Sequence, residues 1–261
     1  MKRLLIKLTC AALALCSVLT LSACGKDEVP QESSAATADT AAVATTAAAP
    51  SAQTDADLGK LHQPVANSDD PFAGFWKITG GVGSDLTHIV YSFDGTKRAR
   101  LLIGTMGFCG LYELKNKDGK DVFITQLMFG LNGTYTYQFS DDKKTVVLTN
   151  IDEETTTTME RQESFSSLPE PVKNPKLDKA LLGAWEDDND EQLYFGSDGV
   201  MYNTLKDFSF TFYTYSAADG VIECTYTMRE ATTEKNTYQV NGDTLTYNGY
   251  AYKRISPDQL G

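Results

Sequence analysis

Two stretches of the chain repeat the same order of landmarks, and each stretch contains one of the two tryptophans. Each begins with a Gly-x-Trp triplet, passes two Asp-Gly pairs and a Tyr-Gln pair, and ends near an arginine. The interval from the first Asp-Gly pair to the Tyr-Gln pair, Gly95–Gln138 and Gly199–Gln239, differs by only three residues. The matched landmarks are Gly74–Trp76 and Gly183–Trp185, Asp94-Gly95 and Asp198-Gly199, Asp118-Gly119 and Asp219-Gly220, Tyr137-Gln138 and Tyr238-Gln239, and Arg161 and Arg254. This pattern indicates the duplication of one small module, which limits the fold to two small domains.

Both copies are patterned as β-structure. Phenylalanine occupies every second position in 208–212, and apolar residues occupy every second position in 222–226, on either side of the Asp219-Gly220 pair. A period of two around Asp-Gly predicts a β-hairpin. In the first copy we expect strands at 74–79, 87–93, 97–103, 109–115, 121–127, 133–139, 144–149 and 156–162. An antiparallel meander of about eight strands can close into a barrel, so the predicted fold is all-β, with two tandem small meander barrels.

Only one short helix is expected. Residues 175–182 lead into the second Gly-x-Trp triplet, with Pro175 at the first helical position and Asn174 able to cap it. Two prolines precede this segment and indicate a connector between the copies. The predicted domains are therefore 70–165 and 174–256, joined by a linker at 166–173.

The start of the chain has the layout of a secretory signal. Basic residues open the segment 1–24, and an apolar stretch from Leu8 to Ala23 follows and ends in small residues. The stretch is shorter than the ~20 apolar residues that a membrane-spanning helix needs, so we expect it to be removed. The four residues Leu21-Ser22-Ala23-Cys24, followed by Gly25, resemble the lipobox of bacterial lipoproteins.

The resemblance to a lipobox implies that Cys24 is diacylated and becomes the new N-terminus. Each acyl CH₂ that enters the bilayer adds about 0.8 kcal/mol of affinity, so several chains anchor the protein firmly. The expected location is the extracytoplasmic face of the cell membrane. The alternative interpretation is that Cys24 is an incidental cysteine near an ordinary cleavage site.

Residues 25–69 are expected to form a disordered tether. Of the 25 residues in 33–57, 19 are Ala, Thr or Ser, without apolar periodicity. A coil of this length reaches roughly 35–40 Å. Cleavage would remove three basic and no acidic residues, which changes the formal charge from −12 to −15. The mature protein should therefore stand off an anionic lipid surface.

Gly-x-Trp on the first strand, a meander of hairpins, and an arginine on the last strand resemble the lipocalin-like domains found in tandem in bacterial surface lipoproteins. The matching residues are Gly74, Trp76 and Arg161 in the first copy and Gly183, Trp185 and Arg254 in the second. The resemblance implies that each tryptophan closes one barrel end and that each arginine lies across its face, a cation–π contact of about 0.5–2 kcal/mol. At this length each barrel should be squat, with an interior that is small or filled by side chains.

Charge and composition exclude several activities. An acidic chain without a basic stripe is a poor candidate for binding nucleic acid. Of the two histidines, His62 falls in the tether, and His88 has no ligand or triad partner at a suitable spacing. The chain has neither a Gly-x-Ser-x-Gly elbow nor a phosphate-binding glycine loop. We therefore predict no catalytic residues, no metal site and no cofactor.

Two further features favour structural interpretations. The segment 186–191 carries five carboxylates in six residues, a density that could hold Ca²⁺. It lacks the turn glycine of an EF-hand loop, and we favour a solvated hairpin. Cys109 and Cys224 remain in the mature chain besides Cys24. Export permits a disulfide between them, although two buried free thiols are the favoured interpretation.

Tyr213 and Tyr215 share one face of a predicted strand, opposite the face of the phenylalanines in 208–212. If the phenylalanines face the barrel interior, the two tyrosines form an outer aromatic strip that could stack on sugars or bind a protein partner. The alternative is that tyrosine is simply favoured in strands.

Together these expectations describe a membrane-anchored lipoprotein that is not an enzyme but a binding or protein-interaction module. Its candidate ligands are a small apolar molecule, a glycan or an envelope protein. One alternative is an envelope-acting hydrolase or isomerase that uses carboxylates alone, which requires paired acids pointing into a cleft. Another alternative is a passive surface spacer.

Overall fold

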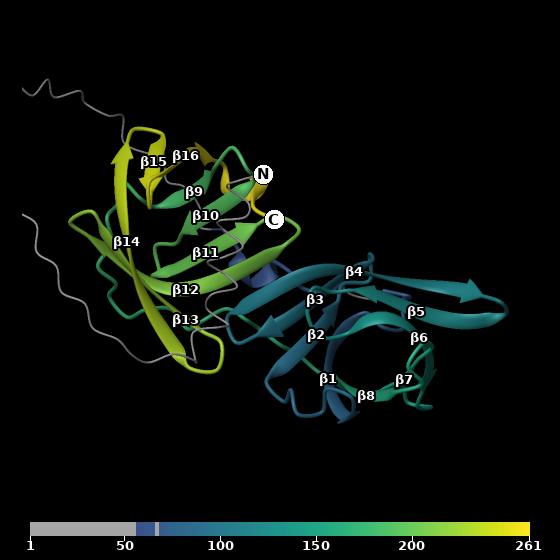
Figure 1. Ribbon diagram of the computed structural model, residues 1–261. Helices are drawn as coiled ribbons and strands as arrows, with labels where there is room; N and C mark the ends of the chain where they lie inside the picture. Colours follow the sequence, from purple (N-terminus) through teal and green to yellow (C-terminus); the bar gives the residue numbers. More distant parts are fainter. Residues whose placement is uncertain (1–55, 66–67) are drawn as a thin grey trace, which may run out of the picture. The chain divides into compact units, whose positions relative to one another are not determined.

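The computed structural model describes residues 56–65 and 68–261 (Figure 1). This part of the chain is all-β, with an eight-stranded closed antiparallel barrel and eight further strands. Two short 3₁₀ turns flank the strands, η1 (Leu58–Lys60) and η2 (Pro257–Gln259). The predicted signal segment 1–24, with Cys24, lies outside the described residues, so the lipid anchor stays a prediction.

The first half of the described chain forms the closed barrel. Its strands pair in the order β4–β3–β2–β1–β8–β7–β6–β5, and the ring closes because β5 also pairs with β4. All eight strands predicted for this half are confirmed, each with ends within three residues of the expected positions. The bounds are β1 (Gly74–Gly81), β2 (Ile89–Phe93), β3 (Arg98–Ile103), β4 (Met106–Lys117), β5 (Lys120–Gln126), β6 (Asn132–Phe139), β7 (Thr145–Asn150) and β8 (Thr156–Gln162).

The second half contributes the other eight strands. They pair in the order β12–β13–β14–β15–β16–β9–β10–β11, with an additional pairing of β11 to β12. The bounds are β9 (Gly183–Glu186), β10 (Glu191–Phe195), β11 (Val200–Leu205), β12 (Ser209–Ala218), β13 (Val221–Thr227), β14 (Ala231–Asn241), β15 (Thr244–Tyr247) and β16 (Tyr250–Ile255).

The predicted Asp-Gly hairpins are present in both halves. Asp118 and Gly119 have φ values of 53° and 79°, and Asp219 and Gly220 have φ values of 53° and 76°. Two successive positive φ angles are those of a type I′ turn, whose twist matches that of the flanking strands. These turns connect β4 to β5 and β12 to β13.

The two halves share backbone hydrogen bonds. β4 pairs antiparallel with β12 over 106–108 and 209–211. The pairing continues at Thr105, whose carbonyl oxygen accepts a hydrogen bond from the Phe212 N–H at 2.8 Å. β13 pairs with β12 only from Thr214 onward. β4 therefore occupies the edge of β12 that β13 leaves uncovered.

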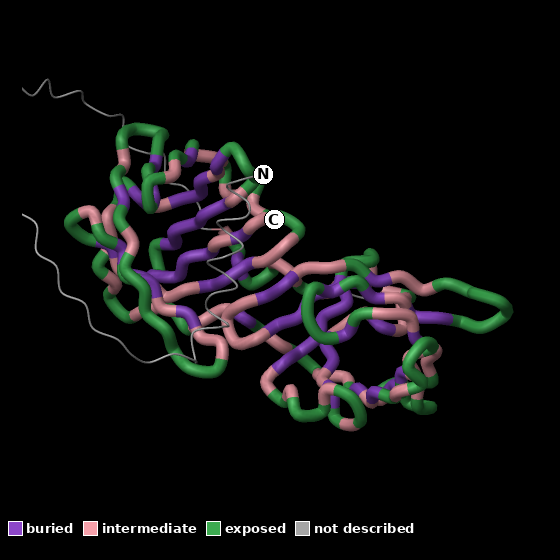
Figure 2. Tube along the Cα trace, viewed as in Figure 1, coloured by how far each residue is buried: buried purple, intermediate pink, exposed green. Residues whose placement is uncertain are grey.

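The buried side chains form three clusters, visible as buried stretches along the strands of both halves (Figure 2). One cluster fills the first half, and a second fills the inner face of the second half. The third, which we call the shared layer, joins outward-facing side chains of both halves. Its buried members are Leu58, Phe75, Val90, Leu102, Ala184, Tyr194, Val200, Tyr202, Phe210 and Phe212.

The helix predicted for 175–182 is wrong, because this segment has no helical residues. Asn174 has a φ of 53°, which is incompatible with the extended conformation of a capping residue. Asp178 instead makes a turn, accepting a hydrogen bond from the Ala180 N–H at 2.9 Å. Leu181 is fully buried in the second cluster, so tertiary packing outweighs local helix propensity here.

The prediction of a disordered tether over the whole of 25–69 is wrong for its described end. Residues 56–65 contain η1 and lie against the shared layer. Leu58 is 7% exposed, and the Ala56 N–H donates to the Tyr194 hydroxyl at 2.8 Å. The Val65 N–H donates to the Asp94 carbonyl at 2.9 Å. We call residues 56–65 the strap.

Candidate functional site

The contacts predicted between each tryptophan and its arginine are present. The Arg161 guanidinium lies 4.4 Å from the centre of the Trp76 ring, and the Arg254 guanidinium lies 4.0 Å from that of Trp185. Both indoles are fully buried. Each indole N–H donates to the carbonyl oxygen four residues earlier, at 2.7 Å for Trp76 and 2.8 Å for Trp185.

Each arginine also binds the chain that leads into its Gly-x-Trp strand. Arg161 donates to the carbonyl oxygens of Ala73 and Pro71, at 2.5 and 2.6 Å. Arg254 makes the equivalent bonds to Leu182 and Ala180, at 2.7 and 2.9 Å. Burial lowers the pKa of both guanidinium groups, but both stay charged because the ordinary arginine pKa is so high.

The glycine of each triplet has a backbone conformation that favours glycine, and Gly74 also makes room for its clamp. A β-carbon on Gly74 would lie 2.6 Å from a guanidinium nitrogen of Arg161, and Gly74 has a φ of 134°. Gly183 has a φ of 108° at the corresponding position. An L side chain is strained in such a backbone conformation. Gly74 is therefore required by both space and backbone geometry, and Gly183 by backbone geometry.

Aromatic side chains fill the interior of the first half. Phe72 is fully buried and stacks on Phe123 with ring centres 4.1 Å apart. Tyr137 and Phe139 lie edge-on to Phe72 at 5.2 and 5.0 Å. Because Phe72 comes from the segment before β1, the entering chain itself plugs this end of the barrel.

The predicted outer strip of Tyr213 and Tyr215 is wrong. Tyr215 is 3% exposed, belongs to the second cluster and donates to the Gly196 carbonyl at 2.9 Å. Tyr213 packs against the same cluster. The opposite face of β12 carries Phe210 and Phe212 into the shared layer. Alternation along β12 was correct, but both faces are aromatic, so the pattern could not show which face is inside.

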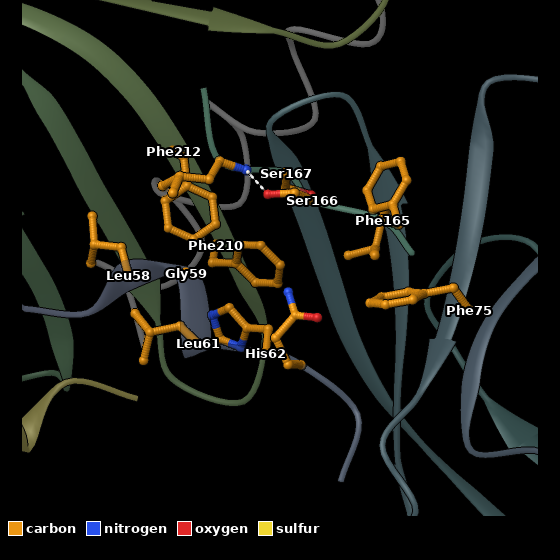
Figure 3. A pocket seen from close by; sticks show the side chains of 13 residues that line it. Leu58, Gly59, Leu61, His62, Phe75, Phe165, Ser166, Ser167, Phe210 and Phe212 are labelled. Atoms are coloured by element: carbon orange, nitrogen blue, oxygen red, sulfur yellow. Dashed lines mark hydrogen bonds between the residues drawn. The ribbon is translucent and has the colours of Figure 1, made fainter. Parts of the chain in front are cut away.

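A small pocket opens in the shared layer between the strap and both halves (Figure 3). His62 of the strap stacks on Phe210 with ring centres 3.8 Å apart and an interplanar angle of 13°. Phe75 and Phe165 line the opposite side (Figure 3). The cavity holds about 20 Å³, room for one water molecule. It is too small for an organic ligand.

His62 is the polar centre of this pocket. Its Nε2 shares a hydrogen bond of 2.9 Å with the Tyr202 hydroxyl, and its carbonyl accepts from Arg100 Nη1 at 3.3 Å. Burial, reinforced by the charge of Arg100, lowers the pKa of His62 to about 3. The imidazole is therefore neutral at physiological pH and serves as a stacked wedge, not as a proton carrier.

Cys109 and Cys224, the two cysteines of the described part of the chain, are free thiols. Cys224 is fully buried, and its Sγ lies 3.6 Å from Met201 Sδ. Burial raises the pKa of Cys224 to about 12 and also raises that of Cys109. A thiol with a raised pKa is a weak nucleophile. The interpretation as buried free thiols therefore describes Cys224 well, while Cys109 is only half-buried against the shared layer.

The remaining candidate residues have structural partners. His88 lies in the turn before β2 rather than in a strand, and its Nε2 accepts from Arg229 at 3.2 Å. In the acidic segment 186–191, Asp187 accepts from the N–H groups of Asn189 and Glu191, which makes a tight turn. Within residues 56–65 and 68–261, no group of three or more His, Cys, Asp and Glu side chains could hold a metal ion.

A larger groove lies on the outer face of β4 and β5. It has a volume of about 200 Å³ and is lined by Lys97, Leu111, Tyr112, Glu113, Ile124 and Gln126. Leu111 is 55% exposed, among the most exposed large apolar side chains of the described chain. The register pairs Leu111 with Gln126 and Glu113 with Ile124, so the groove has an apolar floor with polar neighbours.

No protein-family model matches this sequence, and no curated protein is similar to it. Among the described residues, no helix has the length and apolar character needed to cross a membrane.

Sequence reasoning missed the strap and His62. The signal was present but weak: Leu58, Leu61 and His62 interrupt the Ala/Thr/Ser-rich composition just before the first domain. A single apolar turn of this kind has no partner in its own sequence neighbourhood. Its role depends on Phe210 and Tyr202, which lie about 140 residues further along the chain.

The neutral state of His62 predicts a pH dependence of folding. His62 binds a proton near pH 6.5 in the unfolded state but only near pH 3 in the folded state. The contribution of the neutral imidazole to the free energy of unfolding is therefore complete above about pH 6.5 and is lost as the pH falls toward 3. Between pH 7 and pH 5, urea unfolding should show a loss of stability for the native protein about 2 kcal/mol larger than the loss for His62→Gln. Equal losses in the two proteins would contradict the buried, neutral imidazole.

Proposed function

We propose that the protein is a membrane-anchored extracytoplasmic lipoprotein that acts as a non-catalytic interaction module. In this proposal 1–24 is a signal segment, Cys24 is acylated, and a tether carries two lipocalin-like barrels at 70–165 and 174–256, with 166–173 between them. In this proposal the tether ends before residue 56, because residues 56–65 pack on the shared layer.

The matched clamps support the proposal of two related barrels. In each half an arginine on the last strand covers a buried indole and donates to the carbonyl oxygens three and five residues before it. The register places Trp76 opposite Arg161 and Trp185 opposite Arg254. Agreement of this detail in two segments that share landmarks favours a common origin.

The filled interior of the first half supports the proposal that a partner binds on the outer surface. A carrier needs a cavity that buries most of its ligand, whereas Phe72, Phe123 and their neighbours occupy that space in the first half. The outer groove at Leu111 offers an apolar anchor point beside Lys97 and Glu113. An apolar surface rimmed by polar residues is the arrangement that marks protein-interaction sites, and Leu111 and Ile124 provide the apolar part here.

The alternative of a carboxylate enzyme keeps one specific observation in its favour. Strand alternation brings Glu191 to the same face as Leu193, and Glu234 lies opposite Cys224, so both glutamates lie on the inner face of the second half. Asn203 donates to Glu191 at 3.3 Å. Such an enzyme would lose all activity in Glu191→Gln or Glu234→Gln. A passive spacer would show neither activity nor ligand binding.

A fluorescent fatty acid tests where ligands can bind. The soluble Cys24→Ser form should show no saturable binding in its interior, because aromatic side chains occupy it. Weak binding at the outer groove should disappear in Leu111→Ser. The control Val82→Ser removes another exposed apolar side chain, 57% exposed, away from the groove and should change nothing. Tight binding that survives Leu111→Ser would instead support a ligand carrier.

The anchor is tested by fractionation. Replacing Cys24 by Ser removes the thiol to which acyl chains attach, so the protein should move from the membrane fraction to the medium. The control Cys109→Ser changes a thiol that takes part in no anchor and should leave the protein on the membrane. Continued membrane fractionation of Cys24→Ser would reject the lipid anchor.

A further inference from the structure

Part of β14 has an uncovered edge. β13 pairs with residues 231–237 on one side, but β15 pairs only with 238–241 on the other. Figure 1 shows β14 continuing past the short strand β15. In the part of the chain that the structure describes, no strand pairs with 231–236 on the β15 side. The corresponding strand of the first half, β6, has no such edge, because β7 covers it over 135–139 and the Ile151 N–H donates to the Thr134 carbonyl.

The direction of the free backbone groups follows from neighbouring bonds. The Thr237 N–H donates to Asn248 Oδ1 at 3.0 Å, and the Thr237 carbonyl accepts from the Asn248 N–H at 2.9 Å, both on the β15 side. The N–H of the next residue, Tyr238, points to the other side and donates to Gly220. Since strand residues alternate, Ala231, Thr233 and Lys235 present both their N–H and C=O groups at the open edge.

The molecule already fills one such edge internally. β12 separates from β13 before Thr214, and β4 of the first half pairs with the vacated edge over 209–211. The edge of β14 has the same origin, a strand that outruns its neighbour. Its residues 231–235 are all exposed, and two of them are threonines, which favour strand pairing. An edge of this kind is a template for another strand.

We propose that residues 231–235 of β14 pair antiparallel with the same edge of a second copy of this chain, about a two-fold axis midway between the two copies of Thr233. A two-fold axis perpendicular to the sheet places the inner faces of both copies on the same side of the joined sheet. Side chains alternate between faces along a strand, so two residues that lie opposite each other must both have odd numbers or both have even numbers. When Thr233 lies opposite its own copy, the three residues whose N–H and C=O groups point to the open edge, Ala231, Thr233 and Lys235, all form hydrogen-bonded pairs. These three pairs contain six backbone hydrogen bonds.

Charge selects this register over its neighbours. With Thr233 opposite its own copy, Lys235 lies opposite Ala231 and Glu234 lies opposite Thr232, so no like charges meet. Centring on Glu234 or Lys235 would place two like charges directly opposite each other, which destabilises a strand pair. Lys235 already pairs with Glu223 at 2.6 Å, which partly offsets a charge that commonly protects sheet edges.

Disulfide trapping tests the register. In the soluble Cys24→Ser form, Thr233→Cys should cross-link to its own copy on mild oxidation with copper-phenanthroline, since paired residues lie about 5.5 Å apart. Lys235→Cys is the matched control: it is on the same edge and equally open, but its copies would lie four residues apart along the strand, roughly 13 Å. We expect at least about tenfold more dimer from Thr233→Cys. Equal cross-linking of the two variants would overturn the register.

Sedimentation tests the association without cross-linking. The soluble parent should shift from monomer toward dimer as its concentration rises. Thr233→Pro removes an outward N–H without touching the ladder to β13, so it should stay monomeric with an unchanged circular dichroism spectrum. Thr233→Val keeps the N–H and should behave like the parent. The proposal would be overturned if the parent stays monomeric in sedimentation and the Thr233→Cys variant gives no cross-link. The open edge would then be left to an extended segment of another protein. This outcome does not depend on the proposed function.

Discussion

The described structure depends on burial of the outer surfaces of its two halves in one shared apolar layer. Phe75, Val90 and Leu102 project outward from the first half, and Tyr202, Phe210 and Phe212 project outward from the second. A β-sheet with apolar side chains on both faces needs a second covering layer, and here each half covers the other. Every such large side chain stabilises the folded state by about 1.5–3 kcal/mol when it is fully buried. The strap and the β4–β12 pairing reinforce this arrangement.

This layer also explains how much of the structure could be predicted from the sequence. The strands and turns follow from local signals, since alternation and Asp-Gly pairs act over a few residues. The clamps of Trp76 and Trp185 could be predicted because the repeated landmarks contain the same residues twice. Neither prediction required knowledge of how the two halves meet.

The errors all concern surfaces that become buried through distant contacts. The sequence could not show whether the face of β12 with Tyr213 and Tyr215 or the face with Phe210 and Phe212 points inward. Both faces are buried, one in the second cluster and the other in the shared layer. The strap resembled a tether because its partners lie far along the chain. The segment 175–182 had the signals of a helix, but Leu181 and Tyr238 draw it into an extended path. In each case tertiary packing outweighed a local preference.

For the proposed interaction module, the shared layer means that a partner would meet a surface of fixed geometry. The groove at Leu111 and the open edge of β14 lie on separate strands, so a partner and a second copy could bind at once. A neutral His62 and a Cys109 thiol of raised pKa give the shared layer neither a proton carrier nor a strong nucleophile at physiological pH. Its role is to hold the outer surfaces in place.

Differential scanning calorimetry of the soluble Cys24→Ser form tests most directly whether the shared layer unites the two halves. If the halves depend on each other, they unfold in one transition whose van't Hoff enthalpy equals the calorimetric enthalpy. Two resolved transitions, or a van't Hoff enthalpy about half the calorimetric value, would show that the halves unfold independently and would contradict the account.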